Sequence, residues 1–286
     1  MDVLMTDIIL VTYNRRETLQ KIIESVRNYK WKYNSFLIVN NNSTDDTGTF
    51  LNSLEDSFNI LNLTENVGHG AALAKGLQYL HKKNAYTRYT IFLEDDSIPE
   101  QNLFNKLLDN ITNSDFDLIS SSGKIVKLGK RIDVFPKDTE ILKVDFCLFD
   151  GAVIKNIVFD KIGYPVEDWF MMFDDFEYCY RIRKNNFKIG IVKNDFHQIM
   201  HHGAGDKFSK TSLWRGYYQT RNHVFFLREH FTLFNLFDFL ILNSKRTIAS
   251  LLAPDRSKRF ALRIIGLYHG IINKKGKTLD PVNIKF

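Results

Sequence analysis

The sequence predicts a three-layer α/β fold with a mostly parallel central sheet, followed by a helical C-terminal extension. In the first 110 residues, a short run of apolar and β-branched residues alternates four times with apolar residues at helical spacing. Such alternation is typical of parallel strands that are joined by covering helices. From Leu213 onward only the helical spacing recurs, with a break near Pro254.

The predicted elements follow one another in a regular order. Strand and helix patterns alternate at residues 7–13, 16–28, 35–39, 46–54, 59–63, 70–81, 90–93 and 99–110. Beyond residue 115 the alternation weakens into strand-like runs at residues 117–120 and 144–149. We therefore expect a main α/β domain over residues 1–230 and a basic, amphipathic helical extension over residues 231–286.

The composition is that of an ordinary globular protein of 286 residues, with 44% hydrophobic and 25% charged residues, which excludes disordered and collagen-like classes. Cys147 and Cys179 stand in apolar or aromatic contexts without a CxxC pair, as in a reducing compartment. The N-terminus has no basic start and no long apolar run, so we expect cytoplasmic residence. The apolar stretch at residues 231–242 is too short to span a membrane.

The positive charge is concentrated at the C-terminus. The chain has a net charge of +6, whereas residues 241–286 alone carry ten basic and two acidic side chains. A basic tail that also contains apolar residues suggests contact with an anionic membrane surface or a phosphate-bearing partner. The alternative is a solvated basic helix pair packed on the main domain. No nucleic-acid-binding motif is present, so we expect no nucleic-acid partner, and a homo-oligomer remains open.

Polar segments follow each of the first four predicted strands, at residues 12–15, 40–46, 66–70 and 94–96. In open α/β sheets, ligands bind beyond the C-terminal ends of the strands, so these segments form the expected site. Neither the GxGxxG dinucleotide motif nor the P-loop is present. A phosphate group bound here therefore needs another counter-charge, for which a metal ion is the obvious candidate.

Two acidic clusters are candidates for chemistry. Glu94, Asp95 and Asp96 leave a buried strand together, and such oxygen ligands suit Mg²⁺ or Mn²⁺. The alternative is an acidic turn before the next helix. Asp174 and Asp175 stand in an aromatic helical segment, where a carboxylate at the mouth of a cleft can act as a general base. Alternatively, both simply favour a helix N-terminus.

Two later motifs complete the candidate set. His201 and His202 could complete a carboxylate-bound metal site, although a histidine pair is also common as a hydrogen-bonded structural feature. Tyr218 and Arg221 share one face of the helix that begins near Leu213. The tyrosine suits core packing, whereas the arginine suggests an anionic partner.

The succession VTYNRRETL, VNNNSTDDT, NVGHGAALAKGL, FLEDDSIP, FMMFDDFEYCYRIRKNNFKI, IMHHG and YYQTRN resembles a family-2 inverting glycosyltransferase of the GT-A fold. The likeness covers residues 6–230 and is nearest to the galactofuranosyl- and rhamnosyltransferase branch. It implies a Rossmann-like, mostly parallel central sheet flanked by helices. In this chain Glu94 replaces the more usual aspartate of the metal motif, and FDD replaces the commoner WDD.

The resemblance also implies a role for each matched position. Asp175 would be the catalytic base, and Glu94, Asp96 and His201, with His202 as its alternative, would hold Mn²⁺ or Mg²⁺. The acceptor would contact Trp169 and Asp174. The donor would contact Thr12, Asn14, Arg15, Asp45, Asn66, Gly68, Asp95 and Arg221.

The function that follows is the metal-dependent transfer of a sugar, with galactofuranose favoured, from a UDP- or dTDP-linked donor to a hydroxyl of a growing glycan or glycolipid. We expect a lipid-linked acceptor on a bacterial surface glycan, and an enzyme held peripherally at the inner face of the plasma membrane. One alternative is a rhamnosyltransferase that uses dTDP-rhamnose. Another is a catalytically silent protein that binds a nucleotide-sugar or a polyanion.

Overall fold

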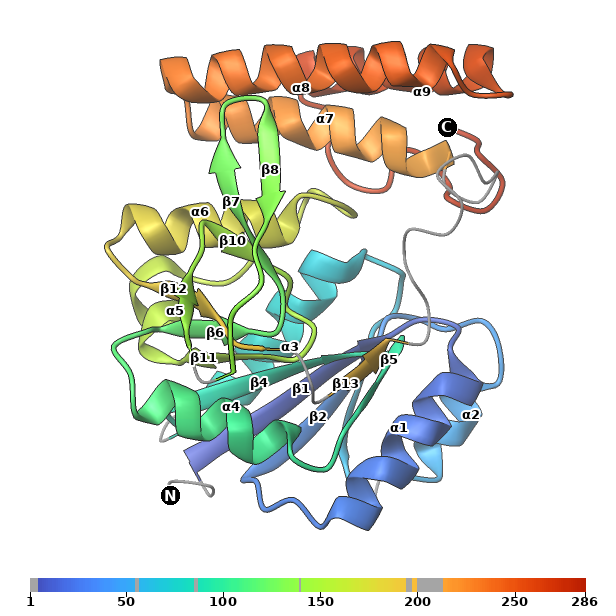
Figure 1. Cartoon of the computed structure of the whole chain (residues 1–286). Helices are drawn as coiled ribbons and strands as arrows, with labels where there is room; N and C mark the ends of the chain where they lie inside the picture. The colour runs from blue at the N-terminus through green and yellow to red at the C-terminus, as the bar shows by residue number, and fades with distance from the viewer. Residues whose placement is uncertain (1–4, 55–56, 85–86, 139, 194–196, 200–212) are drawn as a thin grey trace.

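The structure is a computed structural model that describes residues 5–54, 57–84, 87–138, 140–193, 197–199 and 213–286. Its centre is an eight-stranded, mostly parallel sheet with helices on both faces (Figure 1), as the sequence predicts. The strands lie in the order β3-β2-β1-β4-β11-β6-β12-β9. They are β1 (Thr6–Thr12), β2 (Ser35–Asn40), β3 (Asn59–Asn62), β4 (Tyr89–Glu94), β6 (Leu118–Ser120), β9 (Leu142–Lys143), β11 (Ala152–Lys155) and β12 (Ile189–Ile191).

The remaining strands form two small sheets, and the helices cover the central one. The three-stranded sheet contains β7 (Gly123–Lys127), β8 (Lys130–Asp133) and β10 (Phe146–Cys147), and the two-stranded sheet contains β5 (Ser97–Pro99) and β13 (His197–Ile199). The helices are α1 (Arg16–Tyr29), α2 (Thr47–Asn52), α3 (His69–Lys83), α4 (Leu103–Thr112), α5 (Ile157–Ile162), α6 (Asp174–Lys184), α7 (Leu213–Glu229), α8 (Leu233–Leu251) and α9 (Arg256–Ile271).

Strand register brings the predicted site segments to one edge of the sheet. β1 pairs in parallel with β2 and β4, so that Thr12 lies opposite Asn40 and Val11 lies opposite Glu94. β2 continues the parallel arrangement with β3, whereas β11 runs antiparallel to β4 and β6. The C-terminal ends of β1, β2 and β4 therefore meet, and their polar loops lie together.

The hydrophobic core has two parts, one on each face of the sheet. Along β1, Ile8 and Leu10 pack with α1 and α4, whereas Ile9 and Val11 pack with α3. Successive side chains of a strand point to opposite faces, so one apolar strand contributes to both layers. This double burial explains why the predicted strands have continuous apolar runs.

Two features differ from the sequence-based expectation. Residues 144–149 are strand only at β10, and β7 and β8 form a hairpin that the sequence pattern did not predict. The two strands of this hairpin, GKIVK and KRID, are short, largely exposed or half-buried, and lack a regular alternation, so their strand signal is weak. It is tied to α8, because the Asp238 carboxylate accepts hydrogen bonds from Arg131 at 2.6 Å and from the Gly129 amide at 2.8 Å.

Helices α7, α8 and α9 lie together at the top of Figure 1, above α6, and the tip of the hairpin extends up to them. Helix α9 approaches α7 closely at Gly266 and Gly270. A Cβ at Gly266 would lie 2.5 Å from the Tyr217 carbonyl oxygen, and one at Gly270 would lie 2.7 Å from Val224 Cβ. Helices α7 and α9 thus pack on each other, although the predicted domain boundary near residue 230 lies between them in the sequence. That boundary stays a prediction.

Candidate active site

The loops after β1 and β2 hold each other in place. Asn14 has a left-handed backbone, with φ of 53°, and its amide donates to Ser43 Oγ at 3.1 Å. Its side chain accepts from the Thr44 amide at 2.7 Å and donates to Thr44 Oγ1 at 3.0 Å. Asparagine tolerates this conformation better than most residues, because its side chain can bond to nearby backbone groups.

A polar cavity of about 340 Å³ lies beside these loops. Its lining contains three of the predicted donor-binding residues, Asn14, Arg15 and Asp45. Thr12, which the same prediction includes, is only 1% exposed. The cavity has the size of a small-molecule site, and its lining consists mainly of charged and amide groups.

The loop after β3 is built around two asparagine side chains. Asn41 Oδ1 accepts from the Val67 amide at 3.0 Å, and Asn66 Oδ1 accepts from the Gly68 amide at 3.0 Å. Gly68 has φ of 88°, and a Cβ there would lie 1.8 Å from the Phe170 carbonyl oxygen. Only glycine fits this position, which brings the start of α3 against the loop before α6.

The acidic motif at the end of β4 is crowded. Asp95 accepts a hydrogen bond from the Tyr13 amide at 3.1 Å, and Asp150 Oδ1 accepts one from the Glu94 amide at 3.2 Å. Burial raises the pKa of Glu94 to about 8, because His69 relieves it only in part while Asp150 and Asp96 add repulsion. Since a divalent cation would neutralise this repulsion, the donor set of carboxylate oxygens fits Mg²⁺ or Mn²⁺.

His69, at the first position of α3, joins the two predicted acidic clusters. Its Nδ1 lies 3.0 Å from Asp174 Oδ2 and its Nε2 lies 3.9 Å from Glu94 Oε1. Burial opposes a charged ring, but the hydrogen bond to Asp174 and the charges of Glu94 and Asp174 raise the pKa of His69 to about 10. The sequence analysis did not single out His69, although it stands in the segment after β3 that was expected to face the ligand.

Asp175 lies in the first turn of α6 next to this histidine. Its Oδ1 is inaccessible and has no hydrogen-bond partner. Burial raises its pKa well above the usual value, and the charges of Asp174 and Glu94 raise it further. The structure thus brings Asp175 and Glu94, which are 81 positions apart in the sequence, into electrostatic contact at one site.

The loop before α6 is strained and is held from behind by α7. Phe170, Met172 and Phe173 all have φ between 66° and 76°, a region that residues other than glycine seldom occupy. Asn222 Nδ2 lies 3.0, 2.7 and 2.9 Å from the carbonyl oxygens of Trp169, Met171 and Met172. Asn222 therefore fixes the loop that positions Asp174 and Asp175.

Two predicted ligand-binding residues prove to be structural. Arg221 is fully buried, and its guanidinium donates to the carbonyl oxygens of Trp169 at 2.7 Å and Gly276 at 2.8 Å. Trp169 is 1% exposed and packs on Phe225. The predictions that Arg221 binds the donor and that Trp169 contacts the acceptor are therefore wrong, because neither side chain reaches the surface.

Arg215, near the start of α7, is an arginine that lies near the acidic motif after β4. It is half-buried, and burial lowers its pKa while the nearby charge of Asp96 raises it. Its guanidinium also lies 5.3 Å from the Trp214 ring centroid. The sequence analysis missed Arg215, although it stands only six positions before the arginine that was chosen.

The predicted histidine ligand cannot be placed, since His201 and His202 lie outside the described residues. Among the described residues, the ligand atoms of Glu177, Glu229 and His230 lie within 4.8 Å of one another. However, Arg181 already donates to both carboxylate oxygens of Glu177, at 2.6 and 2.9 Å. A cation at this cluster would face a guanidinium group, so we interpret the cluster as a structural ion pair.

Comparisons with known proteins address the family and the fold of the chain. The family model described as Glycosyl transferase family 2 matches residues 7–184. The low-salt glycan biosynthesis hexosyltransferase Agl10 of Haloferax volcanii is 29% identical over 147 residues, which cover 49% of this chain and 47% of that protein. The Escherichia coli UDP-Glc:alpha-D-GlcNAc-diphosphoundecaprenol beta-1,3-glucosyltransferase WfaP is 33% identical over 92 residues, which cover 32% of this chain and 35% of WfaP.

A solved structure extends the likeness to most of the chain. The mannosyltransferase PcManGT from Pyrobaculum calidifontis, in complex with GDP-Man and Mn²⁺, matches with a TM-score of 0.58 at 13% sequence identity. The match covers 93% of this chain and 75% of the mannosyltransferase. At this identity the likeness concerns the fold, and it supports the GT-A architecture that the sequence predicts.

Proposed function

The chain belongs to glycosyl transferase family 2, and from this membership we propose that it transfers a hexose from a nucleotide-diphosphate donor to a hydroxyl group of a glycan. One observation carries the proposal beyond the family. Asp175 presents a buried carboxylate without a partner for Oδ1, beside the acidic motif that ends β4. A candidate base therefore lies beside a cluster of carboxylates that would hold a cation, at the C-terminal edge of the sheet.

The proposed chemistry is a single displacement at the anomeric carbon. Asp175 takes the proton of the acceptor hydroxyl while its oxygen attacks, and the nucleoside diphosphate leaves from the opposite side, so the configuration inverts. Asp175 suits this role because burial and its acidic neighbours raise its pKa, which makes the carboxylate a better base. Arg215 lies near Asp96, where it would stabilise the departing diphosphate.

We propose Mn²⁺ or Mg²⁺ as the cofactor. Glu94 and Asp96 would hold the ion, with His201 or His202 as a further ligand. When bound, the ion would supply charge stabilisation for the diphosphate leaving group. The crowded carboxylates around Glu94 support this role, and the related mannosyltransferase structure contains Mn²⁺ together with its donor.

The descriptions of the relatives suggest the chemical class of the donor and of the acceptor, but not their identity. The two similar proteins are described as a hexosyltransferase and a glucosyltransferase, which favours a hexose donor. The sequence resemblance favours UDP-galactofuranose, with dTDP-rhamnose as the second candidate. The E. coli protein is described as acting on a diphosphoundecaprenol-linked sugar, and this supports a lipid-linked acceptor here.

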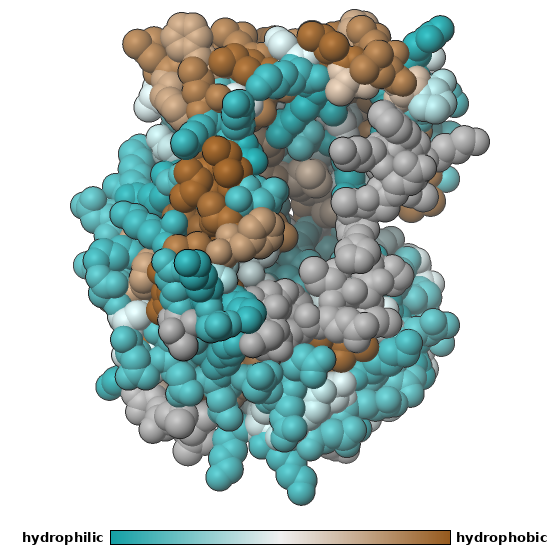
Figure 2. All heavy atoms as spheres, in the orientation of Figure 1, coloured by the Kyte–Doolittle hydropathy of each residue, from teal (hydrophilic) through white to brown (hydrophobic). Residues whose placement is uncertain are grey.

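A lipid-linked acceptor would require contact with a membrane, and α8 and α9 are suited to peripheral contact. Among the described residues, no helix is long and apolar enough to span a bilayer. Both helices instead expose apolar stripes at helical spacing, and Figure 2 shows much hydrophobic surface at this end of the molecule. The stripes consist of Leu233, Phe237, Leu240, Ile248 and Leu251 on α8, and Phe260, Ile264, Tyr268 and Ile271 on α9. With the basic residues of 241–286, they would bind an anionic cytoplasmic surface.

Nucleotide release from a donor panel tests the proposed activity. The panel contains UDP-galactofuranose, UDP-galactose, UDP-glucose and dTDP-rhamnose, each with Mn²⁺ or EDTA and with simple glycan acceptors. We expect turnover of one donor, its loss in EDTA, and a decrease of about 10²- to 10⁴-fold in Asp175→Asn. Asp160→Asn, an exposed change on α5, serves as the matched control.

Two outcomes would contradict the proposal. Binding of a nucleotide-sugar without turnover of any donor, even with lipid-linked acceptors, would favour the catalytically silent alternative. Equal turnover by Asp175→Asn and the wild type would remove Asp175 from the role of base.

For the membrane contact, equal sedimentation of the wild type with neutral and anionic vesicles would contradict the role of the basic tail.

A further inference from the structure

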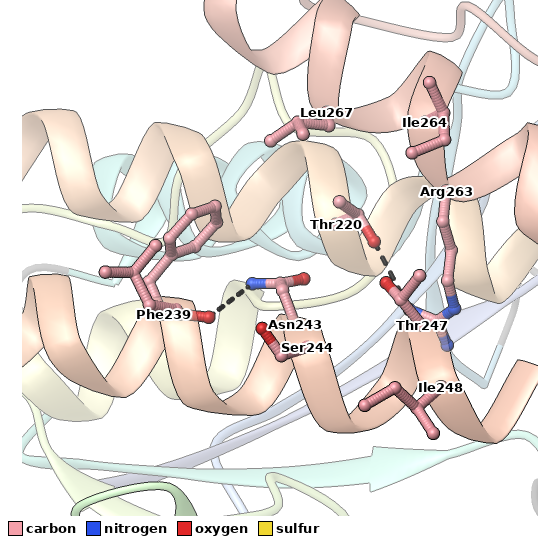
Figure 3. A pocket seen from close by; sticks show the side chains of 10 residues that line it. Thr220, Phe239, Asn243, Ser244, Thr247, Ile248, Arg263, Ile264 and Leu267 are labelled. Atoms are coloured by element: carbon pink, nitrogen blue, oxygen red, sulfur yellow. Dashed lines mark hydrogen bonds between the residues drawn. The ribbon is translucent and has the colours of Figure 1, made fainter.

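A second cavity, of about 380 Å³, lies among α7, α8 and α9 (Figure 3). Most of its wall is apolar, and a few polar groups stand at one end. The lining consists of Thr220 from α7, Phe239, Leu240, Asn243, Ser244, Thr247 and Ile248 from α8, and Arg263, Ile264 and Leu267 from α9. None of the residues of the candidate active site lines it, so it is a separate site.

The polar end contains a guanidinium group without an acidic partner. Arg263 reaches from α9 toward α7, where its Nη1 donates to Thr220 Oγ1 at 3.3 Å (Figure 3). No carboxylate of the described residues forms an ion pair with Arg263. Burial and the charge of Arg259 lower its pKa, so the group is held in a place that disfavours positive charge. An anion beside it would relieve this cost.

Arg246 adds to the positive potential of the same region. Its Nη1 is inaccessible and has no hydrogen-bond partner. Burial and the nearby charge of Arg263 lower the pKa of Arg246 to about 10. Asp238 opposes this shift, but its carboxylate is already paired with Arg131 at 2.6 Å. Two arginines therefore share a region in which the acidic neighbour of Arg246, Asp238, is already paired with Arg131.

Apolar side chains of the lining also reach the surface, and two of them, Ile248 and Ile264, lie beside Arg263 and Thr247 (Figure 3). Leu240, Ile248 and Ile264 line the cavity and are also 48%, 62% and 45% exposed. All three belong to the apolar stripes of α8 and α9 that the proposed membrane contact would bury. The cavity is therefore continuous with the apolar stripes along which a hydrocarbon chain could reach the membrane.

We propose that this cavity binds one anionic phospholipid, with its phosphate group at Arg263 and the start of an acyl chain along Phe239 and Leu267. The inference rests on the membrane contact in the proposed function. The opposing occupant, the same face of a second copy, is disfavoured because residues 241–286 carry ten basic and only two acidic side chains. Two such surfaces would repel each other, whereas an anionic lipid complements both the charge and the apolar wall.

Short-chain lipids test the cavity without a bilayer. Calorimetric titration of the full chain with dioctanoyl phosphatidylglycerol, below its micelle concentration, should give saturable binding of one lipid. We expect binding at least 10-fold weaker for zwitterionic dioctanoyl phosphatidylcholine, and none for glycerol 3-phosphate at the same concentrations. Binding of glycerol 3-phosphate as tight as that of the lipid would overturn the inference in favour of a free phosphate site.

Two variants address the cavity by different routes. Arg263→Gln removes the cation and Ser244→Trp fills the space, and each should weaken binding of the anionic lipid at least 10-fold. Arg256→Gln removes an exposed charge at the start of the same helix and should change it less than 2-fold. Unchanged binding in both cavity variants, when their melting temperatures match the wild type, would overturn the site.

Failure of the lipid-binding cavity can be distinguished experimentally from failure of the proposed function. Wild type that turns over a donor and sediments with anionic vesicles, yet shows no saturable short-chain lipid binding, would overturn the cavity alone. Wild type that binds the short-chain lipid through Arg263 but does not sediment with vesicles would support the cavity and contradict the membrane contact.

Discussion

Arg221 on α7 donates a hydrogen bond of 2.7 Å from its Nη2 to the carbonyl oxygen of Trp169, in the loop before α6. This loop has three non-glycine residues in the left-handed region and ends at Asp174. Such a backbone persists only where its surroundings fix it, and the bonds from α7 supply that constraint. The geometry at Asp175, the proposed base, therefore depends on residues of α7 that lie behind the candidate site.

The first prediction concerns Asn222, which serves the same loop. Asn222→Ala leaves the carbonyl groups of Met171 and Met172 without this donor, and each unsatisfied buried group costs about 1–3 kcal/mol. We expect a loss of about 2–4 kcal/mol in the free energy of unfolding. At a temperature where the variant is still folded, kcat should fall about 10- to 100-fold while the donor KM changes little, since misplacement of the base affects the chemical step.

Gln219→Ala, on the same helix, is the control and should alter neither stability nor kcat measurably. Denaturant unfolding and steady-state kinetics check both variants. A full kcat in Asn222→Ala, together with the expected loss of stability, would show that the loop keeps its geometry without this side chain.

The second prediction compares two glycines with positive φ. Gly68 and Gly163 have φ of 88° and 73°, but a Cβ at Gly68 would lie 1.8 Å from the Phe170 carbonyl oxygen, whereas one at Gly163 meets nothing within 4 Å. Gly163→Ala should cost only the backbone strain, about 1–2 kcal/mol. Gly68→Ala must also displace the loop before α6, so we expect a larger loss of stability and no measurable turnover. Similar melting temperatures for the two variants would contradict the close approach.

Much of the fold was predictable from the sequence, for a physical reason. The central strands are buried on both faces, so they appear as short continuous apolar runs between amphipathic helices. The sequence also marked the acidic motifs at Glu94 and Asp175, because clustered carboxylates are conspicuous; the structure places them together, and their roles stay predictions. The hairpin of β7 and β8 was missed because its strands are short and half-exposed and have no regular alternation of apolar and charged residues.

The error at Arg221 has a different cause. An arginine beside tyrosines on a helix has the same sequence pattern whether it binds a phosphate or backbone carbonyl groups. What distinguishes the two is the strained loop at Phe170 and Met172, and non-glycine residues with positive φ leave no sequence signature. His69 and Arg215 were missed because their partners, Glu94 and Asp96, are distant in sequence and come near only in the folded chain.

The third prediction is that Arg215 contacts the diphosphate group of the donor. A charge-assisted hydrogen bond contributes about 1.5–3 kcal/mol, so Arg215→Gln should raise the donor KM or lower kcat/KM about 10- to 100-fold. Arg215→Lys should restore part of the loss, since a positive charge near Asp96 remains. Arg228→Gln removes an exposed arginine from the other end of α7 and is the control. An unchanged kcat/KM in Arg215→Gln would exclude contact with the diphosphate.

The fourth prediction concerns acid stability and His223 on α7. This imidazole is 1% exposed and packs on Phe173, with ring centroids 4.7 Å apart. Burial, with the charges of Arg246 and Arg131, lowers its pKa to about 3 against the partial opposition of Asp238. The folded chain therefore keeps His223 neutral where the unfolded chain, with an ordinary pKa near 6.5, takes up a proton.

The sign follows directly from these two values. The contribution of His223 to stability is fully present above pH 6.5 and is lost progressively as the pH falls toward 3. Because one pKa unit corresponds to about 1.4 kcal/mol, the loss at pH 5 should be about 2 kcal/mol. In His223→Phe this loss should disappear. The melting temperature of the variant should therefore fall less than that of the wild type when the pH is lowered from 7 to 5. A difference that stays constant over this range, while both proteins unfold reversibly, would mean that His223 is not the group that destabilises the fold in acid.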